Sequence, residues 1–214
     1  YGISTEGIDY AAKHDFTLII ALDCGIKAND KIEYANSKGI DFIIGDHHMP
    51  GDTIPQAVAV LDPKRIDCPY PYKELSGCGI GFKIIQAFIL KNSMNMEEAY
   101  QFLDLVAVSI ASDIVPITGE NRILAHYGLK KLNTNPSIGL QALIDLSSNK
   151  TGIFSVNDIV FQIGPRINAA GRMESGRIAV ELLTASNVND AIRIGNEINE
   201  HNNERKNIDR RITQ

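Results

Sequence analysis

The chain has 214 residues, of which 44% are hydrophobic and 22% charged, and these are ordinary values for a globular protein of one or two domains. No apolar run reaches the roughly 18 residues that a membrane-spanning helix needs, and no signal peptide opens the sequence. The net charge of −5 argues against a broad, nonspecific nucleic-acid-binding surface and leaves room only for a local basic cleft. Three cysteines form no close pair, so we expect a reducing, cytoplasmic compartment and no membrane association.

The first third of the chain alternates between short apolar runs and helical patterns. Strands are predicted at 16–22, 42–44 and 57–61, and the first of these is so continuously apolar that we expect it to be covered on both sides. Helices are predicted at 4–13 and 29–38. Such an alternation predicts parallel strands joined by right-handed crossovers. We therefore expect an α/β fold with a parallel sheet flanked by helices.

The remainder of the chain has mostly helical patterns. Helices are predicted at 77–91, 96–114, 121–132, 136–146 and 156–163, the last after a capping signal formed by Ser155 and Asp158. Residues 164–173 are predicted to be a loop, because glycine and proline interrupt the pattern. A long polar helix follows at 188–214, with a thin apolar stripe made by Ile192, Ile194, Ile198 and Ile208. The sheet is thus expected to precede a mainly helical region and a long C-terminal helix.

Three adjacent ionisable residues, Asp46, His47 and His48, come directly after the second predicted strand. Ligands of open parallel sheets bind at the carboxyl ends of the strands, where these side chains would lie. Asp23 follows the preceding strand and would leave the same edge of the sheet. Carboxylate and imidazole groups are common ligands of catalytic divalent ions. The alternative is a polar turn in which the histidines only cap backbone groups.

Asp113 ends the strongly apolar helical stretch at 96–114. An acid at the end of a buried helix is unfavourable unless it is paired, hydrogen-bonded or bound to a metal ion. Asp113 is therefore a further candidate ligand. A turn-capping acid in front of Pro116 is the alternative.

The segment 164–173 contains Arg166, Asn168 and Arg172. Arginine suits bidentate binding of phosphate, so a phosphate clamp and ordinary surface salt bridges are both compatible with this pattern. The glycines of 77–81 open a helix and would let a phosphate approach its N-terminus, but close packing of the helix is the simpler explanation and the one that we favour.

Several motifs occur together, in a fixed order, and they resemble those of the DHH phosphoesterases. They are Asp23-Cys24-Gly25, Gly45-Asp46-His47-His48, the stretch from Ser76 to Lys83, the stretch from Ala111 to Pro116, and the stretch from Gly164 to Arg172. Within that superfamily, Cys68-Pro69-Tyr70-Pro71 and the stretch from Gly164 to Arg172 resemble the RecJ single-strand-specific DNA exonucleases. The resemblance extends over essentially the whole chain.

This resemblance implies a two-metal phosphodiesterase, using Mn²⁺ or Mg²⁺, that removes 5′-mononucleotides from single-stranded DNA in the 5′ to 3′ direction during DNA repair and recombination. Single-stranded DNA would be its substrate, and a helicase and a single-strand-binding protein its partners in the cell. Arg166, Asn168 and Arg172 would hold substrate phosphates.

The resemblance also implies roles for the groups at the strand ends. Asp23 would bridge the two metal ions, while His47 and Asp113 would complete one of them. Asp46 would accept a hydrogen bond from the imidazole of His47 and so orient that ring, and His48 would face the scissile phosphate. Cys24 is expected to be a small packed residue, and not a ligand.

The chain departs from the family pattern in three ways. The family's first Asp-x-Asp motif has no match in the sequence and would lie before Tyr1, and the family's second domain would lie beyond Gln214. Residues 1–187 would therefore be a DHH catalytic domain without its N-terminal part, and 188–214 the start of a helix that leads to the second domain. On its own the segment is expected to be nearly inactive. Asp62 stands where related sequences favour asparagine before Pro63.

Two other functions are compatible with the fold. One is a DHH enzyme acting on short oligonucleotides, cyclic dinucleotides or pyrophosphate, which the segment 164–172 disfavours. The other is a non-catalytic replication scaffold that has lost its metal ions. The joint presence of Asp23, His47, His48 and Asp113 argues against the scaffold.

Overall fold

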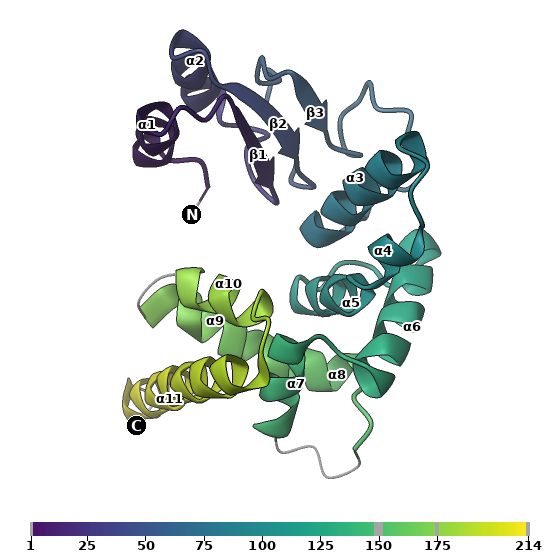
Figure 1. The fold of residues 1–214 in the computed structure, drawn as a ribbon, viewed down its shortest axis with the longest axis vertical. Helices are drawn as coiled ribbons and strands as arrows, with labels where there is room; N and C mark the ends of the chain where they lie inside the picture. The colour runs from purple at the N-terminus through teal and green to yellow at the C-terminus, as the bar shows by residue number, and fades with distance from the viewer. Residues whose placement is uncertain (1, 148–151, 174–175, 213–214) are drawn as a thin grey trace. The chain divides into compact units, whose positions relative to one another are not determined.

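The computed structural model describes residues 2–147, 152–173 and 176–212, and the chain forms two compact units. The first unit contains residues 1–100 and 115–123, and the second contains 101–114 and 124–214. Figure 1 gives the order of the helices and strands along the chain. Each unit has its own hydrophobic core, so each is described separately.

The first unit has an α/β arrangement, as the alternating pattern predicted. Its helices and strands are α1 (Thr5–Lys13), β1 (Leu18–Leu22), α2 (Asn29–Ser37), β2 (Asp41–Gly45), β3 (Ala59–Leu61), α3 (Gly77–Lys91) and α4 (Glu97–Tyr100). The segment 115–123, which includes the first residues of α6, completes this unit.

The three strands of the first unit form a parallel sheet in the order β1-β2-β3. In the register, Leu22 pairs with Gly45, and Gly45 pairs with Leu61. The last residues of all three strands are therefore aligned across the sheet. Asp23 and Asp46, which follow β1 and β2, leave the same edge, and this confirms the expected topology.

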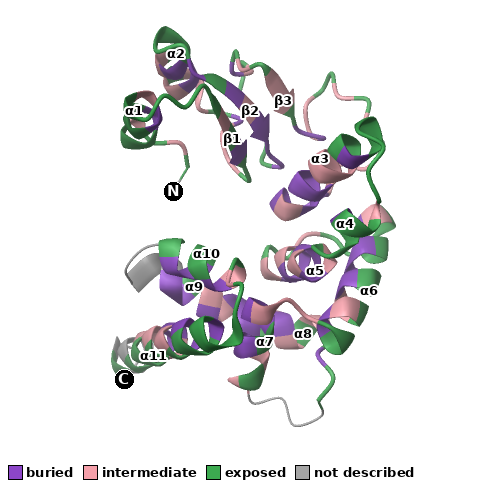
Figure 2. Ribbon diagram, in the orientation of Figure 1, coloured by how far each residue is buried: buried purple, intermediate pink, exposed green. Residues whose placement is uncertain are grey.

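Helices lie on both faces of the sheet, but they cover β1 unequally. Because successive side chains of a strand alternate between faces, Ile19 and Ala21 point to the core that α1 and α2 share, and Leu22 points to the face on which α3 packs. On that second face Leu18 and Ile20 are 47% and 53% exposed. The prediction that this strand is covered on both sides is wrong for the described part of the chain. The central strand β2 is the buried one (Figure 2).

The second unit is helical. Its elements are α5 (Leu103–Ser112), most of α6 (Gly119–Thr134), α7 (Ile138–Asp145), α8 (Val156–Asp158), the π-helix η1 (Ile159–Ile163), α9 (Gly164–Met173), α10 (Gly176–Leu183) and α11 (Val188–Ile212). The mainly helical region and the long C-terminal helix are thus confirmed. The capping box predicted from Ser155 and Asp158 is also present.

Two predictions about these helices are wrong. The single helix expected at 96–114 is divided into α4 and α5, because the chain passes from the first unit to the second at residues 101–102. The segment 164–173 is the helix α9 and not a loop. Pro165 lies in the first turn of α9, which continues directly from the π-helix η1: Gly164 has helical dihedral angles, and its N–H donates to the carbonyl of Ile159. Gly164 packs so closely on Ser112 that packing explains this glycine.

The long helix α11 belongs to the core of the second unit through Ala191, Ile194 and Ile198. Ile192 is 47% exposed and is therefore not part of the buried stripe, while the side chain of Ile208 lies outside the described residues. None of the described helices combines the length and apolar character needed to cross a membrane.

Candidate metal centre

Asp23 occupies a strained turn directly after β1. Its φ of +62° lies in the left-handed region, which residues with a side chain rarely adopt. The backbone N–H of Asp23 donates to the carbonyl of Gly45 at 2.8 Å, so the turn is still attached to the end of β2. Strain of this kind is often found at functional sites, where the surrounding structure holds a side chain in one direction.

Asp23, His47 and His48 come together at the carboxyl edge of the sheet. Each offers one ligand atom, and these atoms lie within 4.8 Å of one another. The Asp23 and His48 side chains are 58% and 59% exposed, whereas that of His47 is only 7% exposed. The group therefore combines one buried imidazole with two groups that reach solvent.

The buried imidazole of His47 has a defined orientation. Its Nδ1 lies 3.1 Å from the carbonyl oxygen of Leu75, and since a carbonyl can only accept, Nδ1 carries the proton and donates. Its Nε2 lies 3.0 Å from Oδ1 of Asp23. A nitrogen lone pair and a carboxylate oxygen repel each other at this distance unless a proton or a cation lies between them. The Asp23 carboxylate and the His47 imidazole therefore suit a divalent metal ion, which Nε2 of His47 would bind.

Asp46 is 1% exposed and is held by several donors. Its Oδ2 accepts from the backbone N–H of Ile26 at 2.9 Å, and its Oδ1 accepts from the N–H of His47 at 2.8 Å and from Nδ1 of His48 at 2.7 Å. Burial alone would raise the pKa of Asp46, but these hydrogen bonds outweigh it and lower the pKa below its ordinary value. Asp46 thus holds the imidazole of His48, and its support of the His47 imidazole remains a prediction. The carbonyl of Leu75 orients His47.

The N-terminus of α3 packs directly against Asp23. Ser76 caps this helix by accepting from the N–H of Gly79 at 3.2 Å. Gly77, its first residue, faces the Asp23 side chain so closely that a Cβ on Gly77 would collide with the carboxylate. Close packing, the simpler explanation of the glycines in 77–81, therefore holds for Gly77.

Asp62 follows β3 and is a third acid at this edge of the sheet, 1% exposed. Its Oδ1 accepts from the N–H of Lys64 at 2.8 Å, but its buried Oδ2 has no hydrogen-bond partner among the residues that the structure describes. Burial raises the pKa of Asp62, and the nearby charge of Asp46 raises it further. Burial likewise raises the pKa of the Cys24 thiol, which agrees with Cys24 not being a ligand.

An open cleft of about 820 Å³ lies in front of the group and is lined by Asp23, Asp46 and His48. Lys27, which precedes α2, and Lys31, in the first turn of α2, line it as well. The sequence does not indicate a role for these lysines, because surface lysines carry no distinctive signal. The cleft is large enough for a phosphate-bearing ligand and has positive charge close to the acidic group.

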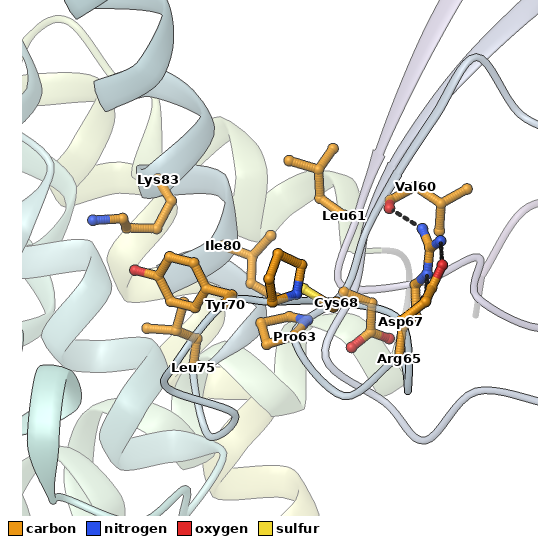
Figure 3. Close-up of a pocket in the computed structure, with 12 residues that line it drawn as sticks. Val60, Leu61, Pro63, Arg65, Asp67, Cys68, Tyr70, Leu75, Ile80 and Lys83 are labelled. Atoms are coloured by element: carbon orange, nitrogen blue, oxygen red, sulfur yellow. Dashed lines mark hydrogen bonds and ion pairs between the residues drawn. The ribbon is translucent and has the colours of Figure 1, made fainter.

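A separate, smaller cavity of about 330 Å³ lies beyond the end of β3 (Figure 3). Its walls are largely apolar and include Pro63, Tyr70, Leu75 and Ile80. At one side of this cavity Arg65 is engaged by the carboxylate of Asp67 and by the carbonyl of Val60. Leu75 thus contributes its side chain to the cavity and its carbonyl to His47.

Four of the predicted site residues belong to the second unit. Asp113 follows α5 as its C-cap and is exposed, and its approach to Asp23 remains a prediction. Asn168 is exposed on α9, whereas the side chain of Arg172 lies outside the described residues. Arg166 is only 9% exposed. A role in phosphate binding also remains a prediction for these residues of α9.

The guanidinium of Arg166 is engaged inside the second unit. It donates to the carbonyls of Gln162 and Leu146 at 2.6 and 2.8 Å and to Oδ1 of Asn199 at 3.0 Å. Leu146 is the C-cap of α7, so Arg166 satisfies a helix-end carbonyl and links α7, α9 and α11. The sequence did not indicate this structural use of the residue.

A family model described as "DHH family, N-terminal domain" matches residues 3–110 of the chain. Among curated proteins, the single-stranded-DNA-specific exonuclease RecJ of Escherichia coli is 34% identical over 98% of the chain, and RecJ of Bacillus subtilis is 36% identical over all of it. The chain spans 38% of the first relative's length and 26% of the second's.

Solved structures give the same result. A crystal structure of the exonuclease RecJ bound to manganese matches 99% of the chain and 53% of its own length, with a TM-score of 0.88 and 27% identity. A structure of RecJ from Thermus thermophilus in complex with Mn²⁺ matches 98% of the chain and 31% of its own length, with a TM-score of 0.86 and 26% identity. These matches bear out the α/β sheet and the helical region that follows it.

Proposed function

Because this chain belongs to the DHH family, we propose that it is the catalytic part of a metal-dependent exonuclease that releases 5′-mononucleotides from single-stranded DNA in the 5′ to 3′ direction. The observation that carries the proposal is the meeting of Asp23, His47 and His48 at the carboxyl edge of a parallel sheet. The similarity to RecJ exonucleases and to manganese-bound RecJ structures supports the substrate and the metal.

Each residue of the centre has a distinct task in this proposal. Asp23 and Nε2 of His47 would hold the metal ions, with Asp113 as a further ligand. A bound Mn²⁺ or Mg²⁺ ion would polarise a phosphate oxygen and lower the pKa of a water molecule. The Leu75 carbonyl keeps the proton of His47 on Nδ1, so that Nε2 stays available as a ligand.

His48 acts on the phosphate in this proposal. Its Nδ1 is held at 2.7 Å by Asp46, whose pKa is lowered, so a carboxylate lies behind the imidazole. Held in this way, the imidazole would face the scissile phosphate and help to neutralise the charge that develops on it. Asp46 and His48 thus form a pair in which the buried acid positions the exposed imidazole.

In the proposal, residues of α9 hold the phosphates of the DNA strand. Asn168 and Arg172 on α9 contact the DNA backbone, and Arg166 shapes the helix that carries them while contributing positive charge. Contacts of this kind do not distinguish bases, as removal of successive nucleotides requires. The cellular setting of the proposal is DNA repair and recombination in the cytoplasm, with a helicase and a single-strand-binding protein as partners.

The test is a Mn²⁺-dependent assay of the full-length protein that contains this chain. Substrates are a long 5′-phosphorylated single strand, the matching duplex, a dinucleotide, a cyclic dinucleotide and pyrophosphate. We expect mononucleotides to be released from the single strand. Asp23→Asn should abolish the release, while Asp41→Asn, at the opposite end of β2 and exposed, should not change it. Preference for a small substrate, or activity that survives Asp23→Asn, would refute the proposal, and inactivity on all substrates would favour a scaffold.

A further inference from the structure

Asn121 is a fully buried residue that fastens two stretches of backbone in the first unit. It is 0% exposed and lies in the first turn of α6. Its Nδ2 donates to the carbonyl of Pro116 at 3.0 Å and, by a shorter bond, to the carbonyl of Glu74. One side-chain amide therefore ties the segment that follows Asp113 to the loop that ends at Ser76.

The carbonyl of Glu74 lies one peptide before the carbonyl of Leu75, which accepts from His47. On the other side of Leu75, Ser76 is fixed as the N-cap of α3, because its carbonyl accepts from the N–H of Ile80 at 3.0 Å. Leu75 itself is 2% exposed. Its carbonyl is thus held between a capped helix and the peptide that Asn121 anchors.

Further contacts join the same two segments. The hydroxyl of Tyr72 donates to the carbonyl of Pro116 at 3.0 Å, and its ring packs on Gly119, whose φ is +45°. The hydroxyl of Tyr70 donates to Glu120 at 2.6 Å, and the same carboxylate pairs with Lys83 of α3 at 2.9 Å. Figure 3 shows Tyr70 at the wall of the cavity, on the side where Lys83 lies. The loop that carries Leu75 is therefore attached at several points to residues 116–120.

We infer that Asn121 is a positioning residue for His47: by holding the Glu74 peptide it fixes the Leu75 carbonyl, which in turn keeps the proton of His47 on Nδ1 and its Nε2 directed at Asp23. This inference extends the proposed function. Its prediction about metal affinity depends on that proposed function, but its prediction about the orientation of His47 in the metal-free protein does not.

A purely structural role for Asn121 predicts a different outcome, and the chain offers a matched control. Asn133, in the second unit, also ties two backbone segments together, donating to the carbonyls of Leu129 and Phe154 at 2.9 Å and accepting from the N–H of Phe154 at 2.7 Å. Asn133→Ala removes a comparable set of bonds far along the chain from His47. Both variants should lower the melting temperature, but only Asn121→Ala should change the imidazole.

The experiment measures the tautomer of His47 and the affinity for Mn²⁺. The protein has five histidines, so nitrogen-15 labelling of histidine alone gives few ring signals, and His47→Gln identifies those of His47. In the metal-free protein we expect a protonated Nδ1, and in Asn121→Ala a mixture of the two tautomers. Since partners behind a metal ligand contribute about 10 to 100-fold in affinity, Asn121→Ala should weaken Mn²⁺ binding by about 10-fold.

Unchanged His47 signals in a folded Asn121→Ala protein would overturn the inference, as would an equal change in Asn133→Ala. If Asn121→Ala does not fold, Asn121→Ser replaces it with the same readouts, because the shorter hydroxyl cannot reach both carbonyls at once. The proposed function fails separately: if His47→Gln leaves Mn²⁺ affinity unchanged, the metal assignment is wrong, whereas the tautomer signals still decide the role of Asn121.

Discussion

The two compact units bury polar side chains in different ways. In the second unit, Asp104 is 0% exposed, accepts from the N–H groups of Leu105 and Ser137 at 3.0 and 2.6 Å, and pairs with Lys131 at 3.2 Å. In the first unit, the buried Asp46 instead directs one oxygen to His48, which is exposed in a cleft. A buried acid whose partners are all internal is structural, whereas one that holds an exposed imidazole points to chemistry.

The largest expected effect is on the stability of the second unit. Asp104→Ala leaves the ammonium of Lys131 and the N–H of Ser137 without their buried acceptor. Breaking a buried ion pair by removing one partner costs roughly 3–5 kcal/mol, so the free energy of unfolding should fall by about that much. Urea denaturation measures the change. A decrease of less than about 1 kcal/mol, a typical surface value, would contradict the structural role of Asp104.

In the first unit, removal of the proposed ligand His47 should change metal affinity and leave the fold intact. His47→Gln should lower the Mn²⁺ affinity by about 100-fold, while the protein stays folded. Partners behind a metal ligand contribute about 10 to 100-fold in affinity, and a ligand itself should contribute at least as much as the largest of these effects. His14→Gln is the matched control, because Nδ1 of His14 also bonds a backbone carbonyl, that of Tyr10 at 2.8 Å, but on an exposed helix end. Calorimetric titration with Mn²⁺ measures both. Equal affinities in the two variants would show that His47 is not a metal ligand.

Arg166 tests this comparison, because it is buried like a structural residue but is expected to bind phosphate like a functional one. Hydrogen bonds from charged groups contribute about 1.5–3 kcal/mol, so Arg166→Ala should destabilise the protein by about 2 kcal/mol. Asn168→Ala, on the exposed side of α9, should leave stability within about 0.5 kcal/mol of the original. Denaturation measures both variants.

Binding to single-stranded DNA separates the two roles of α9. If α9 carries the phosphate contacts, Arg172→Ala should weaken binding equally for all base sequences and reduce the salt dependence of the affinity by roughly one unit of slope. If Arg166 acts on phosphate only through the helix, Arg166→Ala should weaken binding without this reduction. Titrations at several salt concentrations measure the slopes. An unchanged slope in Arg172→Ala would contradict phosphate binding by this residue.

The smallest expected effect concerns Asp62, the buried acid with one unpartnered oxygen. Its pKa in the folded protein is above the ordinary value of 3.8, so the folded state binds the proton more tightly than the unfolded state does. Ionisation of Asp62 therefore lowers stability as the pH rises from that value through the raised pKa of the folded state. Asp62→Asn should raise the free energy of unfolding by about 1 kcal/mol at pH 7 and by less at pH 3. A destabilised variant at pH 7 would show that the carboxylate has a compensating partner.

Much of the first unit could be predicted from the sequence because short apolar runs and the residues that follow them are local signals. The strands at 42–44 and 57–61 and the position of Asp23 beside His47 follow from such signals together with the parallel topology. The roles of Asp46 and His47 could not be predicted in detail. A main-chain carbonyl orients His47, and the sequence does not show which carbonyl will come within reach of a ring.

The second unit was harder to predict where tertiary packing overrides local propensity. Glycine and proline at 164–165 indicate a loop, but both are accommodated in the first turn of α9, since the glycine lets the helix pack on Ser112. The continuous apolar pattern of 96–114 conceals the turn at 101–102, where the chain changes core. Arginine at 166 has the same sequence signature whether it binds phosphate or caps a helix end.

Gly77 shows how a residue without a functional group can behave like an active-site residue in a genetic screen. The space in which its Cβ would lie is occupied by the carboxylate of Asp23, so even alanine at position 77 has to displace that carboxylate. In a saturation library, all nineteen replacements should group with the inactive variants of Asp23, although the protein remains abundant. An observer who ranks positions by intolerance alone would count Gly77 among the ligands. Only the structure shows that its contribution is an empty volume.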